Sequence, residues 1–426
     1  MAHMNPVQLP VAFVLLVVWC AGAIAQSNVV ELKTADVLRG KVIGNEDVRE
    51  LIGNVHFVQT SSTGEVIKVW CDRALQYMTQ NKVELFGNVQ LIRDTTILRA
   101  AEGVYYTDEK RAAMSKGVSL RRGSMLLTSK TGEYFSDEKR AHFTGDVVVA
   151  DSASTTVSDV FTYFEDDEHS IAVGRVRVMN PEQAVTIYGD SLVHFDQLHY
   201  TVIPKNPRFV QIDTTADGAI DTLVVVSKFM EAFRDPSGRF IATDSVTIVR
   251  TDLAAQCRRA TFYTKQDRII LEREPIVWYR ESQVTGDSMV VTLEDRRLRS
   301  VYVRGRAMAI SRTDTLHKNR FDQLTGRELT MYFADQKLDR IVAVRNAMSL
   351  YYLFEEDRPN GANKASGDRI SIAFEDGKVN DITVVGGVQG QYFPETMMNS
   401  REHRYNLDGF RWIEQKPRRH RLEIVQ

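Results

Sequence analysis

The strongest constraint on the fold is that the chain repeats itself. Residues 105–112 read YYTDEKRA and residues 134–141 read YFSDEKRA, so that Asp108 and Asp137 stand at the same position in two copies of one pattern. Asp side chains bond their own backbone and tolerate tight turns, so this acidic-then-basic pattern predicts the tips of β-hairpins. It recurs as SDEKR (136–140), EDDEH (165–169), FDQLH (195–199), TKQDR (264–268), EDRRL (294–298), ADQKL (334–338) and EDGKV (375–379). The flanking segments alternate polar and apolar residues, as half-buried strands do.

A glycine follows each of the early turns and precedes a valine-rich segment. The glycines Gly53, Gly87, Gly117, Gly145 and Gly174 recur with a nearly constant period of about 30 residues. Looser versions are VRGRAMAI (303–310), VRNAMSLY (344–351) and VGGVQGQY (385–392). A period in this range predicts an array of stacked units that share one core, and the glycine predicts a bend or bulge in the returning strand. About ten units at ~4.8 Å per strand predict a rod roughly 50 Å long.

The rod is expected to have an apolar interior. The residues after each glycine alternate, and His56, Gln90 and Ser119 stand between apolar neighbours. The apolar set is predicted to line one continuous face; it comprises Val55, Phe57, Val89, Leu91, Val118, Leu120, Val147, Val149, Val176 and Val178. On spacing alone this face is either a groove or the filled core of a closed solenoid.

Composition excludes several classes of protein. The chain has 54 Lys and Arg against 56 Asp and Glu among 426 residues, so no global charge favours nucleic acid or an acidic ligand. With 43% hydrophobic residues it is too apolar for a disordered protein.

The N-terminus predicts export. Residues 11–25 form an apolar run that ends in Ala23-Ile24-Ala25, which is typical of a secretory signal cleaved after residue 25, although MAHMNPVQLP lacks Lys and Arg and Met4 is an alternative start. The run is shorter than the roughly 20 residues of a membrane-spanning helix. Trp19 before Cys20 disfavours a lipoprotein. An oxidising compartment would permit a bridge between Cys71 and Cys257, but in a linear array they would lie many units apart, so two unpaired, half-buried thiols are favoured.

The leader, the all-β pattern and the in-phase units Gly53-Asn54-Val55, Gly87-Asn88-Val89, Gly117-Val118 and Gly145-Asp146-Val147 resemble the OstA-like family of periplasmic lipopolysaccharide-transport proteins. The resemblance covers residues 30–200 well and 260–395 more loosely. It implies an elongated, open antiparallel β-jellyroll, a V-shaped solenoid of stacked hairpin repeats. It implies no enzymatic activity and no cofactor, a groove that holds the acyl chains of lipopolysaccharide or a related glycolipid, and a place in the periplasm or at the outer membrane. It also implies end-to-end β-augmentation with other jellyroll proteins of this kind, and an outer-membrane translocon as a partner.

The chain is accordingly divided into a signal peptide (1–25), N-terminal repeats (26–200), irregular repeats or a junction (201–260), C-terminal repeats (261–395) and a basic cap or tail (396–426). Residues 354–367 are expected to form a loop. The basic residues at the end are Arg401, Arg404, Arg411, Lys416, Arg418, Arg419 and Arg421, and acidic lipid headgroups are an alternative partner for them.

No catalytic or metal site is predicted. His194 and His199 flank a hairpin tip without a third ligand at suitable spacing, and the charged turns are read as solvated faces. Gly386-Gly387 lacks the strand–helix context of a dinucleotide loop. Two other classes of function stay open: a β-solenoid carbohydrate-active enzyme such as a polysaccharide lyase, and a structural or adhesive surface repeat. Antiparallel hairpins argue against the first, and a filled interior would favour the second.

Overall fold

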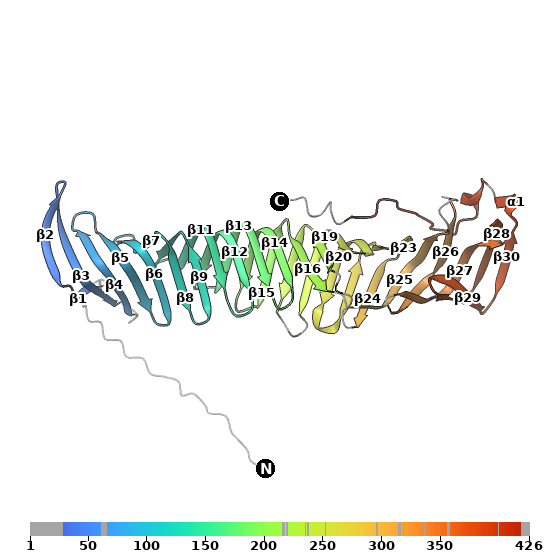
Figure 1. Ribbon diagram of the computed structural model, residues 1–426, viewed down its shortest axis with the longest axis horizontal. Coiled ribbons are helices and arrows are strands. Elements are labelled where there is room, and N and C mark those ends of the chain that lie inside the picture. Colours follow the sequence, from blue (N-terminus) through green and yellow to red (C-terminus); the bar gives the residue numbers. More distant parts are fainter. Residues whose placement is uncertain are drawn as a thin grey trace, which may run out of the picture.

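The computed structural model describes residues 29–418, except 61–65, 215–217, 219, 235, 237, 252, 295–296, 314–316, 318, 336, 356–357 and 399. The predicted signal peptide therefore lies outside the described residues. The described chain is an elongated rod of thirty antiparallel strands with only short helical turns (Figure 1). Among the described residues, no helix has the length and apolarity that crossing a membrane requires. The all-β antiparallel fold predicted from the repeat is confirmed.

The N-terminal half contains β1 (Val29–Thr34), β2 (Val37–Ile43), β3 (Glu46–Thr60), β4 (Val66–Tyr77), β5 (Lys82–Arg93), β6 (Thr96–Tyr106), β7 (Arg111–Ser115), β8 (Val118–Arg122), β9 (Met125–Ser129), β10 (Thr131–Phe135), β11 (Arg140–Ala150), β12 (Thr155–Phe164), β13 (His169–Asn180) and β14 (Val185–Phe195). The middle of the rod contains β15 (Tyr200–Lys205), β16 (Arg208–Thr214), β17 (Ile220–Val226), β18 (Phe229–Phe233), β19 (Arg239–Arg250) and β20 (Leu253–Tyr263).

The C-terminal half contains the turn η1 (Thr264–Gln266), then β21 (Arg268–Glu272), β22 (Ile276–Tyr279), β23 (Ser282–Thr285), β24 (Ser288–Glu294), β25 (Arg297–Arg312), β26 (Phe321–Ala334), β27 (Lys337–Glu355), β28 (Arg358–Glu375), β29 (Lys378–Val385) and β30 (Gln389–Phe393). Two short turns follow, α1 (Glu395–Met398) and η2 (Glu402–Arg404). The three longest strands, β25, β27 and β28 with 16, 19 and 18 residues, lie in this half.

Long strands along the rod are divided by a bulge, in several of them at a glycine that the sequence marked; in β19 and β27 the bulge lies at Asp244–Ser245 and Arg345–Asn346 instead. Gly53 and Asn54 have φ of 73° and 46°, and the pairing register of β3 with β4 shifts between Ile52 and Val55. The same shift occurs at Gly87, Gly145, Gly174 and Gly305. These bulges follow one another from strand to strand. We call their line the spine; it separates layer A, whose hairpins close at the acidic-then-basic turns, from layer B on the other side. The predicted bend is confirmed.

A carboxylate explains why glycine is needed at the spine. A Cβ atom built on Gly53, Gly87 or Gly174 would collide with the side chain of an aspartate, respectively Asp36 between β1 and β2, Asp72 in β4 and Asp159 in β12. Asp36 and Asp72 in turn accept hydrogen bonds from the amides of Asn54 and Asn88. The repeat therefore carries an aspartate half a unit before each of these glycines, which the sequence reading missed.

Layer A is held together along its outer face by stacked rings and cations. Arg111 lies 4.3 Å from the ring centre of Tyr106, and Arg140 lies 4.0 Å from that of Phe135. Neighbouring tips are also linked, since Lys110 pairs with Asp137 and Lys139 with Asp166 at 2.8 and 2.7 Å. These exposed ion pairs agree with the reading of the turns as solvated faces, and each contributes little stability alone.

Two expectations need revision. A unit places two strands, not one, in each layer, so the rod is about 100 Å long at ~4.8 Å per strand, twice the predicted length. The predicted loop 354–367 is wrong, because β27 and β28 extend their layer B segments through it and pair from Ala347 with Gly367 to Glu355 with Arg358. Residues 201–260 form strands β15–β20 in the same two-layer arrangement; the proposed division of the chain there stays a prediction.

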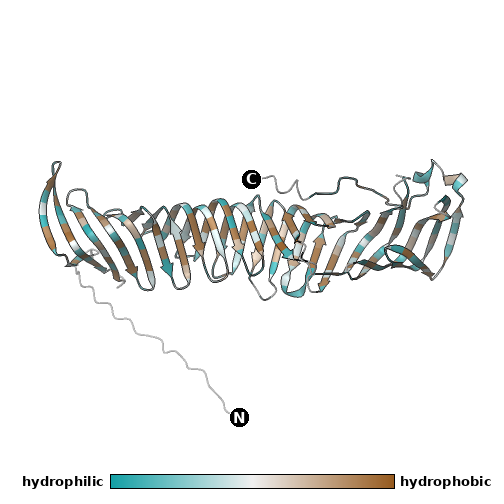
Figure 2. Ribbon diagram, in the orientation of Figure 1, coloured by the Kyte–Doolittle hydropathy of each residue, from teal (hydrophilic) through white to brown (hydrophobic). Residues whose placement is uncertain are grey.

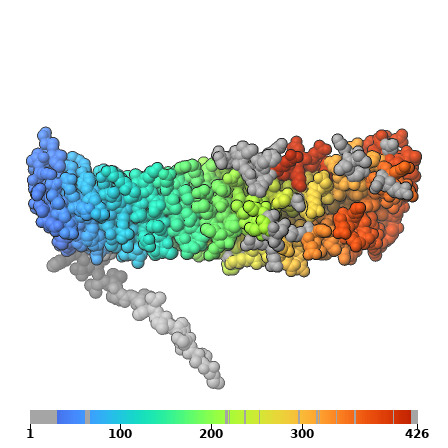
Figure 3. Space-filling view, in the orientation of Figure 1, coloured from blue at the N-terminus to red at the C-terminus, as the bar shows by residue number. Residues whose placement is uncertain are grey.

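The C-terminal segment runs back along the rod instead of projecting from it (Figure 1). We call residues 395–418 the strap. Its Met398 and Leu407 are buried against the outer face of layer B, with Phe410 and Trp412 packed beside them; the residues that they cover include Met308, Ile310, Phe321, Leu350 and Tyr352. Further along, Ile413 packs on Trp278. In the space-filling view its red atoms lie on the surface of the C-terminal half (Figure 3). The strap thus forms a third layer over this half.

Two buried glutamines and one buried arginine hold the strap. Gln283 donates to the carbonyl of Arg411 at 2.7 Å and accepts from the amide of Ile413 at 2.9 Å. Gln323 accepts from the amide of Leu407 at 2.8 Å. Arg320 forms ion pairs with Glu395 and Glu402 at 2.5 and 3.5 Å. These side chains hydrogen-bond the backbone and turns of the strap. They therefore fix its path, which nonspecific apolar contacts alone would not do.

The two described cysteines are not paired with each other. Cys71 and Cys257 are both free and buried in the apolar interior. Burial raises the pKa of the Cys71 thiol to about 11 and that of Cys257 to about 12. The prediction that no disulfide joins them is confirmed, and both thiols stay protonated at neutral pH, which makes them weak nucleophiles.

Candidate functional site

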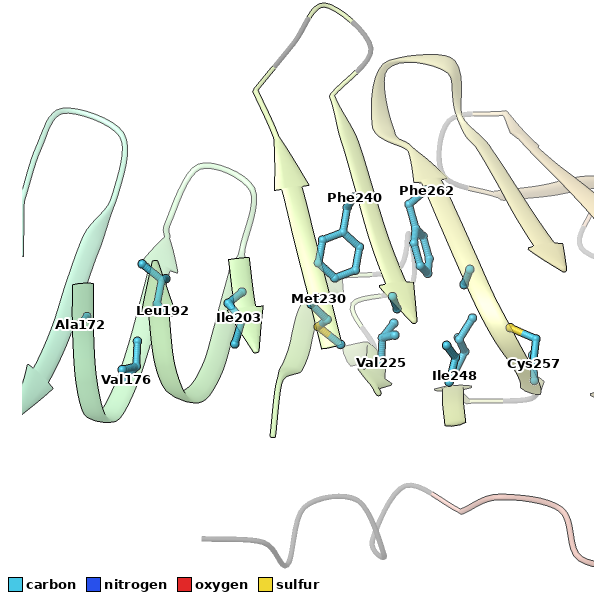
Figure 4. Packing of buried hydrophobic residues seen from close by; sticks show 14 of the residues in the cluster. Ala172, Val176, Leu192, Ile203, Val225, Met230, Phe240, Ile248, Cys257 and Phe262 are labelled. Atoms are coloured by element: carbon cyan, nitrogen blue, oxygen red, sulfur yellow. The ribbon is translucent and has the colours of Figure 1, made fainter. Parts of the chain in front are cut away.

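One apolar cluster fills the space between the two layers along nearly the whole rod. It extends from Leu51 in β3 to Ile372 in β28. Figure 4 shows its middle, where Val176, Leu192, Ile203 and Met230 follow one another from strand to strand. The hydropathy colouring shows brown and teal bands alternating along many of the strands in view (Figure 2). The repeat therefore produces a continuous apolar interior.

The ten predicted interior residues all lie in this cluster or pack against it. The five nearest the spine are almost completely buried; Val55, Val89, Val118, Val147 and Val176 are 0 to 3% exposed. Phe57 is also buried, whereas Leu91, Leu120, Val149 and Val178 are half-buried. The interior is thus tightly packed at the spine and becomes accessible toward the free edges of the layers, which we call the mouth.

Polar side chains span the mouth of the N-terminal half. Gln59 of layer B donates to the hydroxyl of Tyr105 in layer A at 3.3 Å. Arg93 of layer B donates to the hydroxyl of Tyr134 at 2.7 Å and to Glu165 at 2.5 Å. In each bond one partner belongs to layer B and the other, far away in the chain, belongs to layer A. These bonds therefore join the two layers directly. We call this set of cross-mouth bonds the latch.

A third arginine–tyrosine bond continues the latch in the next unit. The guanidinium of Arg122 hydrogen-bonds the hydroxyl of Tyr163, and burial, the larger influence, raises the pKa of that hydroxyl. Burial likewise raises the pKa of Tyr134. Burial disfavours the charged form of Arg93, but its bonds to Glu165 and Tyr134 outweigh this and raise its pKa. The buried phenols of the latch, Tyr134 and Tyr163, are therefore neutral, and the guanidinium of Arg93 is charged.

The latch tyrosines were missed as site residues by the sequence reading, although a signal was present. Tyr105, Tyr134 and Tyr163 occupy the same position in three successive units, shortly before the acidic turns. Arg93 and Arg122 likewise occupy one position in two successive units, where they close the apolar face of layer B. What local periodicity does not give is which tyrosine faces which arginine.

His194 and His199, which flank the turn at residues 195–199, have different surroundings. His194 faces the interior row, where its Nδ1 lies 2.8 Å from the Thr201 hydroxyl and its Nε2 lies 3.0 Å from Asp196. Burial lowers the pKa of His194. His199 lies in the turn, with φ of 47°. Among the residues that the structure describes, no three His, Cys, Asp or Glu side chains are grouped as metal ligands.

The mouth of the C-terminal half is apolar instead. Its half-buried residues that pack against the main cluster include Leu293, Leu298, Phe333, Leu338 and Phe374. Tyr279 of layer B meets Phe333 of layer A edge to face, with ring centres 5.8 Å apart. A depression of about 570 Å³ opens beside Leu298 and Phe333, flanked by Arg297 and Arg299.

Within the described residues, both ends of the rod present strand edges without a pairing partner. At the N-terminal end β1 and β2 pair only with β3, and Leu38 and Val42 are 62% and 70% exposed. At the other end β29 and β30 pair only with β28, and Val385 and Val388 are exposed. Such edges offer free backbone donors and acceptors for pairing with another strand.

Comparison with known proteins identifies part of the chain. Residues 27–190 match the family of OstA-like proteins. No curated protein matches the chain. Among solved structures, LptH of Pseudomonas aeruginosa, described as the LptA-homologous periplasmic component of the lipopolysaccharide transport device, is similar over 33% of this chain and 95% of that chain, with 16% identity and a TM-score of 0.26. The WD40 domain of SCAP from fission yeast covers 81% of this chain and 97% of that chain, with 9% identity and a TM-score of 0.10. At these scores neither likeness supports a conclusion.

Proposed function

Because residues 27–190 are an OstA-like region, we propose that this chain is a periplasmic lipid-binding protein that shields the acyl chains of lipopolysaccharide and helps to bridge the inner and outer membranes during its export. The observation that supports this most is the continuous apolar cluster between the two layers, which all ten predicted residues line. No covalent chemistry is needed for this role.

The energetics suit a carrier. Acyl chains expose on the order of a thousand Å² of apolar surface in water, and burial gains about 25 cal/mol per Å². Equivalent rungs repeat every two strands, so a bound chain could move from one rung to the next without leaving the apolar environment. The half-buried residues Leu91, Leu120, Val149 and Val178 are the ones that a lipid would touch first.

The exposed edges support the proposed partners. An additional rod that paired with β1 and β2, or with β29 and β30, would extend the two layers and the interior together by β-augmentation. We propose other jellyroll proteins of the transport bridge, and an outer-membrane translocon, as the partners at these ends. The signal peptide at residues 1–25, export to the periplasm and outer-membrane association are part of the same proposal.

A structural or adhesive repeat protein is the second candidate. The nearly complete burial of Val55, Val89 and Val147 favours it, because a solenoid that is filled by its own side chains needs no ligand. For the same reason Val118→Glu would unfold either kind of protein and cannot separate the two candidates. A solenoid carbohydrate-active enzyme has no comparable support from the structure.

The test is native mass spectrometry of the exported chain, residues 26–426, titrated with lipopolysaccharide. We expect saturable adducts that excess lipid A displaces, and that weaken when half-buried Leu120 is changed to Gln. The matched control is Ser119→Gln on the opposite face of the same strand. A folded protein that binds no lipid would leave the structural repeat as the better account.

A further inference from the structure

Two strands of layer B have the same three-part order from the spine to the mouth. In β5 the interior residues are Val89, Leu91 and Arg93, and in β8 they are Val118, Leu120 and Arg122. The first residue is buried, the second is half-buried and the third is an arginine at the mouth. The equivalent third residues of β3, β11 and β13 or of the turns that follow them are Gln59, Asp151 and Asn180, so only β5 and β8 carry an arginine there among these five units. Arg250 follows Val246 and Ile248 in β19 in the same way, but it is ion-paired with Asp221.

An apolar floor with a cation at the edge is complementary to an anionic amphiphile. We propose that Arg93 and Arg122 bind the phosphate groups of a lipid headgroup at the mouth while the acyl chains lie between the layers; this rests on the proposed function and names the headgroup chemistry for it. Guanidinium groups bind phosphate by paired, charge-assisted hydrogen bonds. Only β6 separates the two strands, so the arginines are about 10 Å apart, two strand spacings.

The latch bonds show that these arginines already hold oxygen ligands. Arg93 donates one nitrogen to the Tyr134 hydroxyl and another to the Glu165 carboxylate, which is a stand-in for an oxyanion. Arg122 bonds the Tyr163 hydroxyl. Since the side chains of Arg93 and Glu165 are 21% and 26% exposed, their ion pair is reachable from solvent and a phosphate can replace the carboxylate. Replacement breaks the inter-layer bond, so binding a headgroup opens the mouth at the same unit.

The experiment uses native mass spectrometry of the full exported chain with two probes, bis-phosphorylated lipid A and the same lipid A with both phosphates removed. We expect the double variant Arg93→Gln/Arg122→Gln to lose roughly tenfold or more in affinity for the phosphorylated lipid and to keep its affinity for the dephosphorylated one. The matched control is Arg121→Gln, because Arg121 is exposed on the outer face of the same strand as Arg122. It should bind both lipids as the wild type does.

A second variant tests the same proposal in the opposite direction. Glu165→Gln removes the carboxylate that competes for Arg93, so affinity for the phosphorylated lipid should rise several-fold with no matching rise for the dephosphorylated lipid. A double arginine variant that binds phosphorylated lipid A as well as wild type overturns the proposal. So does an equal gain for both lipids, which would mean that the arginines only close the mouth. Wild-type protein that takes up neither lipid refutes the proposed function itself.

Discussion

The two halves of the rod have the same backbone plan and use the outer face of layer B differently. In the N-terminal half that face carries exposed arginines, such as Arg99, Arg121 and Arg177. In the C-terminal half the corresponding face carries Met308 and Ile310, 4% and 1% exposed under the strap. The bulge, the hairpin tips and the interior are common to both. The third layer of the C-terminal half thus rests on outward alternate residues that are apolar there and charged in the N-terminal half.

The mouth differs in the same sense, polar in the N-terminal half and apolar in the C-terminal half. The N-terminal half is bridged there by tyrosines, arginines and a glutamine, and the C-terminal half is lined there by Leu298, Phe333 and other apolar residues. A rod of this plan can therefore keep one half closed by polar bonds and the other by apolar contacts.

The largest expected effect is on the strap. Deleting residues 396–426 uncovers Ile310, Phe321, Leu350 and their neighbours, and each large apolar side chain that becomes exposed costs about 1.5–3 kcal/mol, so the C-terminal half should lose more than about 5 kcal/mol. Hydrogen exchange should accelerate in β25–β28 and stay unchanged in β4–β13. A deletion of 419–426 alone is the control. Equal acceleration in both halves would show that the rod unfolds as one unit.

The next effect compares a buried and an exposed ion pair. Arg320→Met leaves the carboxylates of Glu395 and Glu402 beside an apolar group, and we expect a loss of about 3–5 kcal/mol in the free energy of unfolding. Lys110→Met removes the exposed pair with Asp137 in the N-terminal half and should cost less than about 1 kcal/mol. Urea unfolding measures both, and similar losses would contradict the burial difference.

The spine is what the halves share, so it should respond alike in both. Alanine at Gly87 or Gly305 meets a positive φ and an aspartate side chain, respectively Asp72 and Asp287, and should cost about 2–4 kcal/mol in thermal or urea unfolding. Gly117→Ala meets only the positive φ, since no atom lies within 4 Å of its Cβ position, and should cost about 1 kcal/mol. If Gly305→Ala were as mild as Gly117→Ala, the spine would differ between the halves.

The smallest effect is a pH dependence of the polar mouth. Burial lowers the pKa of His194 below its ordinary 6.5, with Asp196 opposing and Arg234 reinforcing the shift. The folded protein then binds this proton less tightly than the unfolded chain, so the contribution of His194 is complete above pH 6.5 and is lost as the pH falls below that value. Thermal unfolding between pH 7.5 and 5 should show a decline that His194→Gln reduces. An unchanged decline would assign it to other groups.

Much of the fold was predictable because its signals are local. The DEKR turns, the alternation of Val89 and Leu91 with Gln90, and the glycine before them each reflect the conformation of a few neighbouring residues. They predicted the hairpins, the bulge and the ten interior residues. The predicted length of the rod was wrong because the pattern does not show how many strands each unit places in a layer. The predicted loop at 354–367 was wrong because polar residues such as Asn360 and Lys364 can extend an exposed strand.

The candidate site was predicted less completely. Sequence placed Val55 to Val178 on one face, but Asp72, Tyr134 and Arg93 were not recognised, because their partners lie at other places in the array. Tyr134 is half-buried and bonded to Arg93 only through the way in which the layers are offset. The basic composition of residues 396–426 masked the alternate Leu407, Phe410 and Trp412 that bury the strap.

The sequence by itself determined what backbone sterics and side-chain alternation enforce: antiparallel hairpins, a bulge at each glycine and a continuous apolar interior. Only the tertiary structure decided which residues meet across the mouth and where the strap runs. The pairs Gln59 with Tyr105 and Arg93 with Tyr134 depend on the twist that accumulates over several strands, and the strap depends on a surface built from β20 to β28. Neither the pairing across the mouth nor the path of the strap is set by any one segment, so no local sequence pattern encodes them.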